Sequence, residues 1–304
     1  MARPGYSKNI VAVRDPSVGL IVRNRELIVV SSVTSVLHVQ DVEEVLALLE
    51  RLMVPTAIES VARRQRALIE SLVSAGAILV LHQSGKTLTA SSRHAIDVSH
   101  GAAAAHRSDR CSRLVVAATG AIQSFLLPKL LHSAFLPFAR IVDVILTDGG
   151  QHFVTKHAIQ AMGARVWTEI FATGDAPVPH IELAKADLVV VYPASAATLH
   201  RLASGACSDL VSLVAAATAA PVMVVPAMNG RMWSHPPIRR NVLDLIDNGT
   251  FVVVPTLMHE VAAGIRSQPI YGGAGVGSHN LVASMASVLA HGAKPRARNS
   301  ATRA

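Results

Sequence analysis

The chain has 304 residues, of which 51% are apolar and 16% are charged, and its mean hydropathy is +0.40. A chain this apolar is expected to bury a large core, which excludes an intrinsically disordered protein. The formal charge of +8 suggests a nucleic-acid partner, but residues 293–304 alone carry four of these charges, and residues 1–292 hold 24 basic against 20 acidic residues. We therefore expect a nearly neutral folded part, a basic disordered tail at 293–304, and no nucleic-acid partner.

The two cysteines, Cys111 and Cys207, are too few for a disulfide framework and do not have the spacing of zinc ligands. Charged residues interrupt each early apolar stretch, so no secretory signal is predicted and a cytoplasmic protein is expected. Residues 210–230 are uncharged and long enough to span a membrane. Pro221 and Pro226 instead indicate a buried helix followed by a strand, and no membrane partner is expected.

Residues 1–92 are predicted to form a small α+β domain. Alternating β-branched residues within 8–38 indicate two or three antiparallel strands. Apolar residues at helical spacing indicate a helix from about Asp41 to the residue before Pro55 and a second over about 58–75, and a strand follows at 77–83. Strands, two helices and a closing strand in about 85 residues outline a winged-helix domain.

A linker is predicted at 93–112, where small and polar residues show no periodicity. The spacing of its histidines fits no metal-site template, so a solvated linker is favoured and no metal is predicted; these are His94, His100 and His106.

The stretch 113–292 alternates short apolar runs with helical segments. Four of the runs are RLVVAA, RIVDVILT, DLVVVYP and PVMVVP. Near-continuous Val, Ile and Leu runs are typical of a parallel sheet that helices cover on both faces. We therefore predict a doubly wound α/β domain, flavodoxin-like or Rossmann-like, over 113–292. Such sheets bind ligands beyond the carboxyl ends of their strands.

The residues that follow these runs are small or polar. Thr119-Gly120-Ala121 opens a helix after the first run, and such a turn favours either phosphate binding or simple helix packing. Thr147 ends the second run, and Phe153 follows it six residues later. The third run is preceded by PHIEL, which contains His180, and is followed by PASAAT at 193–198. The fourth leads into PAMNGRMW at 226–233.

In these two signatures the chain resembles the flavin-dependent cysteine decarboxylase family. This family includes phosphopantothenoylcysteine decarboxylase and the enzymes that act on the C-terminal cysteine of lanthipeptide, linaridin and thioamitide precursors. Its signatures read PASANT and PxMNxxMW, where the chain has PASAAT and PAMNGRMW. The resemblance extends over about residues 113–255.

The resemblance implies FMN as cofactor and a role for each matching residue. His180 would be the active-site base, Met228 and Asn229 would hold the substrate carboxylate, and Ala197 replaces an asparagine that contacts flavin and substrate. Ala121 stands where the family commonly has serine. The residues expected to bind FMN are Thr119, Gly120, Ala121, Thr147, Phe153, Ser195 and Ala196, and those expected to bind substrate are Met228, Asn229 and Ala197.

The resemblance also assigns a substrate lid to residues 255–277. In the pantothenate branch this lid carries a cysteine that returns electrons to the product, and here it has none. A cysteine-free lid favours a net oxidative decarboxylation.

The leading functional hypothesis is FMN-dependent oxidative decarboxylation of the C-terminal cysteine of a ribosomally made precursor peptide. Its product would be an aminoenethiol, which a dehydrated residue could trap as a thioether ring. Residues 1–92 resemble domains that pair an edge strand with a leader peptide; subunit assembly and DNA binding are the alternatives. The resemblance implies a homo-oligomer, a trimer or a dodecamer. The alternative functions are phosphopantothenoylcysteine decarboxylase and, because of Ala197, a non-catalytic flavoprotein or regulatory subunit.

Overall fold

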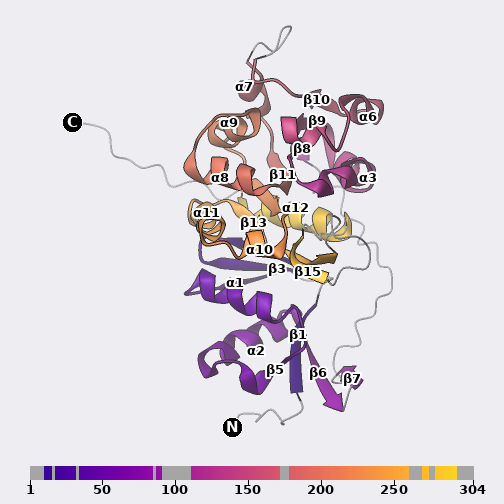
Figure 1. Ribbon diagram of the computed structural model, residues 1–304. Helices are drawn as coiled ribbons and strands as arrows, with labels where there is room; N and C mark the ends of the chain where they lie inside the picture. Colours follow the sequence, from indigo (N-terminus) through magenta and orange to yellow (C-terminus); the bar gives the residue numbers. More distant parts are fainter. Residues whose placement is uncertain are drawn as a thin grey trace, which may run out of the picture.

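A nine-stranded sheet is the centre of the molecule (Figure 1). The structure, a computed structural model, describes residues 10–15, 18–31, 34–84, 87–90, 111–171, 178–259, 269–273 and 278–292. The strand order is β10-β9-β8-β11-β12-β13-β2-β3-β4. The first six strands are parallel: β8 (Cys111–Ala118), β9 (Ala139–Leu146), β10 (Arg165–Trp167), β11 (Leu188–Ala194), β12 (Val222–Pro226) and β13 (Phe251–Val253).

In chain order these six strands are arranged 3-2-1-4-5-6, the order of the doubly wound Rossmann fold. The predicted fold class is therefore confirmed. All seven residues of β11 are buried, because apolar helices cover the sheet on both sides. The order in which strands are added to the sheet reverses between the parallel strands β8 and β11, and the crevice at this point is where such sheets bind ligands.

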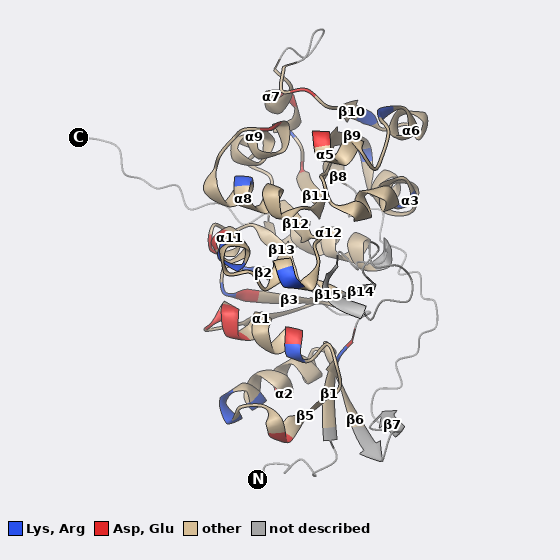
Figure 2. Ribbon diagram, in the orientation of Figure 1, with Lys and Arg blue, Asp and Glu red and all other residues tan. Residues whose placement is uncertain are grey.

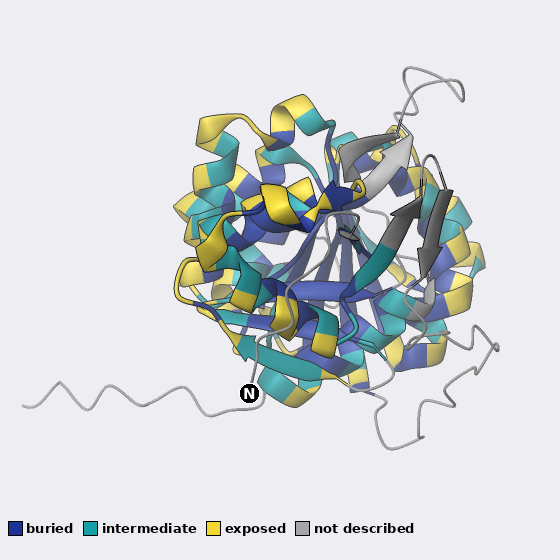
Figure 3. Cartoon of the chain, turned by 90° about the horizontal axis from the view of Figure 1, so that it is seen from below, coloured by how far each residue is buried: buried dark blue, intermediate teal, exposed yellow. Residues whose placement is uncertain are grey.

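Helices pack on both faces of the sheet, and the core divides into two clusters accordingly. Alternate residues of β8 belong to opposite clusters, with Val115 in one and Val116 in the other. The first face is covered by α8 (Ala196–Ser204), α9 (Leu210–Ala217) and α11 (Pro236–Asp247). The second is covered by α3 (Leu127–Leu130), the π-helical turn Leu131–Phe135, α4 (Leu136–Phe138), α6 (Lys156–Ala161) and α12 (Ser278–Gly292). Figure 3 shows the buried strands at the centre and the exposed helix surfaces outside.

The N-terminal region contributes to two different sheets. Strands β2 (Gly19–Arg23), β3 (Glu26–Val30) and β4 (Ser35–His38) extend the large sheet, because β2 pairs antiparallel with β13. A second, four-stranded sheet has the order β5-β1-β6-β7. Its strands are β1 (Ile10–Arg14), β5 (Thr56–Ala57), β6 (Ile78–Ser84) and β7 (Thr87–Ala90). The helices α1 (Val42–Arg51) and α2 (Arg66–Ser74) share a hydrophobic core cluster with this sheet.

We expected residues 1–92 to form a domain separate from residues 113–292, and this division is wrong for most of the strands within 8–38. Only β1 belongs to the small sheet, whereas β2 to β4 belong to the large one. The physical reason lies in burial: Leu20 and Ile21 are both fully buried and belong to opposite core clusters. A strand buried on both faces suits the inside of a covered sheet better than a small domain with one solvated face.

Some predicted segments lie outside the described residues. These are most of the linker, the tail at 293–304, and the lid residues 260–268 and 274–277. The predicted linker ends two residues earlier than expected, since β8 already begins at Cys111. The described part of the lid is the hairpin of β14 (Thr256–His259) and β15 (Pro269–Gly273).

Charge and hydropathy agree with a folded, nearly neutral body. Acidic and basic residues are interspersed over the described elements (Figure 2). Among the described residues, no helix is long and apolar enough to cross a membrane. The uncharged stretch 210–230 folds as α9, β12 and the start of α10 (Gly230–Trp233), as its prolines predict.

Candidate functional site

The loops that follow β8, β9, β11 and β12 lie at one edge of the sheet, because parallel strands end on the same side. They contain Thr119 to Ala121, Thr147 to Gly150, Ser195 to Ala197 and Ala227 to Asn229. The structure thus brings together most residues that the sequence analysis selected. The exception is His180 in α7 (Pro179–Leu183).

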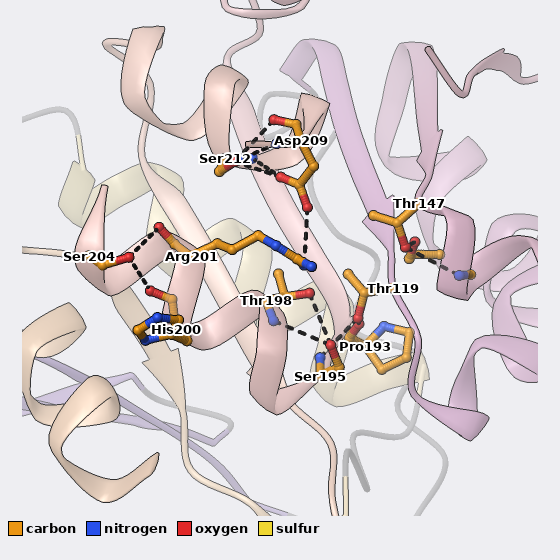
Figure 4. A network of polar contacts seen from close by, with 12 residues as sticks. Thr119, Thr147, Pro193, Ser195, Thr198, His200, Arg201, Ser204, Asp209 and Ser212 are labelled. Carbon is orange, nitrogen blue, oxygen red and sulfur yellow. Dashed lines mark hydrogen bonds and ion pairs between the residues drawn. The ribbon is translucent and has the colours of Figure 1, made fainter. Parts of the chain in front are cut away.

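Thr119 connects the two strands that flank the crevice (Figure 4). Its Oγ1 donates to the carbonyl oxygen of Pro193 at 2.6 Å and accepts from the backbone N–H of Ser195 at 2.9 Å. The side chain is completely buried. The single hydroxyl hydrogen is therefore used within the protein, so Thr119 shapes the loops and is not itself a donor to a bound phosphate.

Glycines let the first two loops approach each other closely. A Cβ atom on Gly149 would lie 2.7 Å from the Cα atom of Gly120, and one on Gly150 would lie 2.5 Å from the carbonyl oxygen of Ala118. Neither distance is possible without moving backbone, so these positions require glycine. The sequence analysis selected Gly120 but missed Gly149 and Gly150. The adjacent glycine pair after ILTD was the available signal.

Three helices begin at this edge, and each has a polar N-cap. Thr147 caps α5 (Asp148–Gln151) by accepting from the N–H of Gly150, Ser195 caps α8 by accepting from Thr198, and Asn229 caps α10 by accepting from Met232. Helix N-termini present unpaired N–H groups and the positive end of the helix dipole. Their convergence at one edge fits an anionic group such as a phosphate.

Helix α8 begins at this edge with two small residues. Ala196 is half-buried and Ala197 is exposed. Neighbouring α9 is fixed to α8 by an ion pair of 3.3 Å between Arg201 and Asp209, and Asp209 also forms a capping box with Ser212 (Figure 4). Helix α8 is thus held by its own cap at Ser195 and, through Arg201, by the residue that caps α9.

Met228 and Phe153 differ in their exposure at this edge. Met228 is 9% exposed and packs in the core, so it supports the loop and presents little surface to a ligand. Phe153 is 39% exposed and Phe125, in the 3₁₀ turn Ile122–Leu126 after β8, is 49% exposed. Both exposed aromatic side chains thus lie in segments that follow β8 and β9, the strands whose loops carry Thr119 and Thr147.

His180 lies at the opposite edge of the sheet. It belongs to α7 (Pro179–Leu183), which precedes the amino end of β11. The seven residues of β11 separate the two edges by about 20 Å at ~3.3 Å per residue. Within one chain, the structure therefore does not bring His180 to the other predicted site residues. Its Nδ1 atom is buried and has no hydrogen-bond partner among the described residues.

A chain of charges fixes α7 to the sheet. Arg113 at the start of β8 donates to the Glu182 carboxylate at 2.6 Å and to Asp143 at 2.8 Å, and the completely buried Asp143 also accepts from Arg165 and Trp167. Hydrogen bonds from Lys185 and Arg113 lower the pKa of Glu182 to about 2. The network is a structural clamp two residues from His180, which the sequence analysis did not predict.

Together, the strand order, the crevice between β8 and β11 and the capped helices define a Rossmann-type protein with a site for an anionic ligand. The family model described as Flavoprotein matches residues 102–270, more than half of the chain, and the chain belongs to this family.

Curated relatives match the same region. The chain is 36% identical over 118 residues to the coenzyme A biosynthesis bifunctional protein CoaBC of Bacillus subtilis (strain 168), covering 38% of this chain and 29% of that protein. It is 41% identical over 117 residues to the protein of that name from Mycobacterium tuberculosis (strain ATCC 25618 / H37Rv), covering 38% and 28%. The chain thus spans less than a third of these relatives.

Among solved structures, a PPC decarboxylase mutant complexed with pantothenoylaminoethenethiol has a TM-score of 0.51 and 27% identity, covering 60% of this chain and 100% of that one. The peptidyl-cysteine decarboxylase EpiD has a TM-score of 0.50 and 21% identity, covering 58% and 98%, and supports the fold alone.

Proposed function

We propose that the protein binds FMN at the carboxyl edge of its sheet and oxidatively decarboxylates the C-terminal cysteine of a ribosomally made peptide. The observation that carries the proposal is the convergence of Ser195 and Asn229, from the two family signatures, on the edge where Thr147 caps a third helix. The helix N-termini and the glycine-lined contact suit the FMN phosphate, and Phe153 and Phe125 suit its apolar ring. FMN would be held by the backbone of these loops, with the hydroxyls of Thr147 and Ser195 beside it.

The chemistry requires an electron acceptor, a carboxylate site and a base. When bound, FMN supplies the two-electron acceptor. The cysteine side chain loses two hydrogens, one of them the thiol proton, and becomes a thioaldehyde. The C=S group then accepts the electron pair of the breaking C–C bond as carbon dioxide leaves, and protonation gives the enethiol. Asn229 uses Oδ1 as a helix cap, so its Nδ2 hydrogens would hold the carboxylate without adding a charge.

We further propose that His180 acts on a site formed with another copy of the chain. The two edges lie about 20 Å apart, and apolar residues surround α7: Phe171 is 82%, Val178 44% and Ile181 53% exposed. A contact between the α7 edge of one copy and the carboxyl edge of the next uses two different surfaces. Such heterologous contacts close into rings when the rotation allows, as in a trimer or in a dodecamer of trimers.

Two experiments test these proposals. The flavin-loaded protein is incubated with cysteine-terminated precursor peptides, and mass spectrometry is expected to show loss of carbon dioxide and two hydrogens. Loss of carbon dioxide alone from phosphopantothenoylcysteine would support the alternative, which the CoaBC and PPC decarboxylase matches favour. To test the shared site, inactive H180N and N229A proteins are mixed under subunit exchange. Restored activity supports a base from a second copy, and a mixture as inactive as its components contradicts it.

For the N-terminal region, we propose recognition of the precursor's leader. β4 pairs with β3 on one side and ends the large sheet among the described residues, so its other side can pair with an extended peptide. Comparing KM for a full-length precursor and for its C-terminal fragment tests this. A lower KM for the precursor is expected, and equal values would instead favour a role in assembly.

A further inference from the structure

Residues before 102 lie outside the family match. They nevertheless contact the signature PAMNGRMW at 226–233 and the residue that precedes the lid hairpin. In α1, the Glu50 carboxylate accepts from the Trp233 indole N–H and from the Arg239 guanidinium, each at 2.5 Å. At the end of β1, Arg14 donates to the carbonyl oxygen of Pro255 at 2.7 Å, directly before β14.

Glu50 and Trp233 come from parts of the chain 183 residues apart. Trp233 is completely buried, and the Arg239 guanidinium lies 5.4 Å from the centre of its ring. The Glu50 oxygen therefore satisfies an indole donor and a cation that is itself only 12% exposed. Removing this acceptor takes one hydrogen bond from the indole and one from the guanidinium, and the loss of a hydrogen bond in a buried site is costly.

Trp233 is linked directly to the predicted substrate residue. Its backbone N–H donates to the Asn229 carbonyl oxygen at 3.0 Å, and the Asn229 side chain caps the same short helix, α10. A four-residue helix has little stability of its own, so its orientation depends on the contacts of its side chains. α10 also contacts β15 of the lid hairpin. The position of Trp233 is thus coupled through α10 to that of Asn229.

We propose that Glu50 is a positioning residue for substrate binding, which acts through Trp233 on the Asn229 loop. The expected change in KM rests on the proposed function. The contact between Glu50 and Trp233 can be tested without activity. It gives the N-terminal region a part in forming the substrate site, in addition to any binding of a leader.

The test compares E50A, E50Q and a control, E43A, which removes an exposed carboxylate from the same helix. Each is loaded with flavin, and kcat and KM are measured for a cysteine-terminated peptide. We expect E50A to raise KM about tenfold with kcat changed less than about threefold, since it misplaces a binding group and no reacting group. E50Q keeps an acceptor for the indole and should restore most of the affinity, and E43A should match the wild type.

A second readout does not need turnover. The chain has two tryptophans, so W167F leaves Trp233 as the only one. At equal flavin content, E50A in this background should make Trp233 fluorescence more accessible to acrylamide, whereas E43A should not. Unchanged quenching, or an unchanged KM, would overturn the proposal. A wild-type protein without decarboxylase activity would overturn the proposed function alone, because the quenching comparison would still decide whether Glu50 holds Trp233.

Discussion

The Thr119 hydroxyl offers a direct test of how the two central loops are held. Replacing Thr119 by valine preserves the shape of the side chain but removes both hydrogen bonds, to the Pro193 carbonyl and from the Ser195 N–H. A buried backbone group left without a partner costs about 1–3 kcal/mol. Because Pro193 is buried and Ser195 only half-buried, T119V should lower the free energy of unfolding by about 2–4 kcal/mol.

The matched control is T119S, which keeps the hydroxyl and loses one methyl group, at a cost of about 1 kcal/mol. Urea unfolding of the flavin-free proteins, followed by circular dichroism, measures both variants against the wild type. Titration with FMN should in addition show weaker binding to T119V than to T119S, since the loops then lose their mutual orientation. If the two variants are equally stable within about 0.5 kcal/mol, the two hydrogen bonds do not hold the crevice together.

Three further predictions concern charge and the altered signature. Truncating the buried carboxylate in D143A should cost about 3–5 kcal/mol in urea unfolding, while R165A, at a side chain 49% exposed, should cost less than about 1. The depressed pKa of Glu182 stabilises the fold above pH 4.5, and this gain is lost as the pH falls toward 2; melting curves of wild type and E182Q should therefore converge over that window. The variant A197N places at this exposed position the asparagine of the signature PASANT, and it should raise kcat/KM for the peptide. An unchanged kcat/KM of the flavin-loaded variant would refute a role for this position.

The parallel part of the fold could be predicted because its strands are continuous apolar runs. The runs in β8, β11 and β12 are buried on both faces and have no other stable location. The same property was present in GLIV and LIVV of β2 and β3, but proximity in sequence to α1 favoured a local domain. Pairing between residues more than 200 positions apart leaves no local pattern, so the contact of β2 with β13 could not be foreseen.

The sequence predicted which loops form the candidate site. It predicted less well what the individual side chains in and around these loops do. Motif spacing located Ser195 and Asn229, and strand order then placed them on one edge. The use of the Thr119 hydroxyl by Pro193 depends on tertiary geometry that no spacing encodes. The separation of His180 from the other residues follows from its place before β11, a consequence of topology that the motif alone does not express.

The pairing of β2 with β13 constrains how the chain can reach its native state. Val22 pairs with Val252, so the large sheet is completed only after the residues up to β13 have left the ribosome. Until then β2 and β3 expose apolar surface and unpaired backbone, which favours association between chains. A fragment cut at the start of the family match would meet the converse problem, because β13 would become an open edge. The strands β2 to β4 therefore cover the β13 edge of the sheet, although they are synthesised well before it.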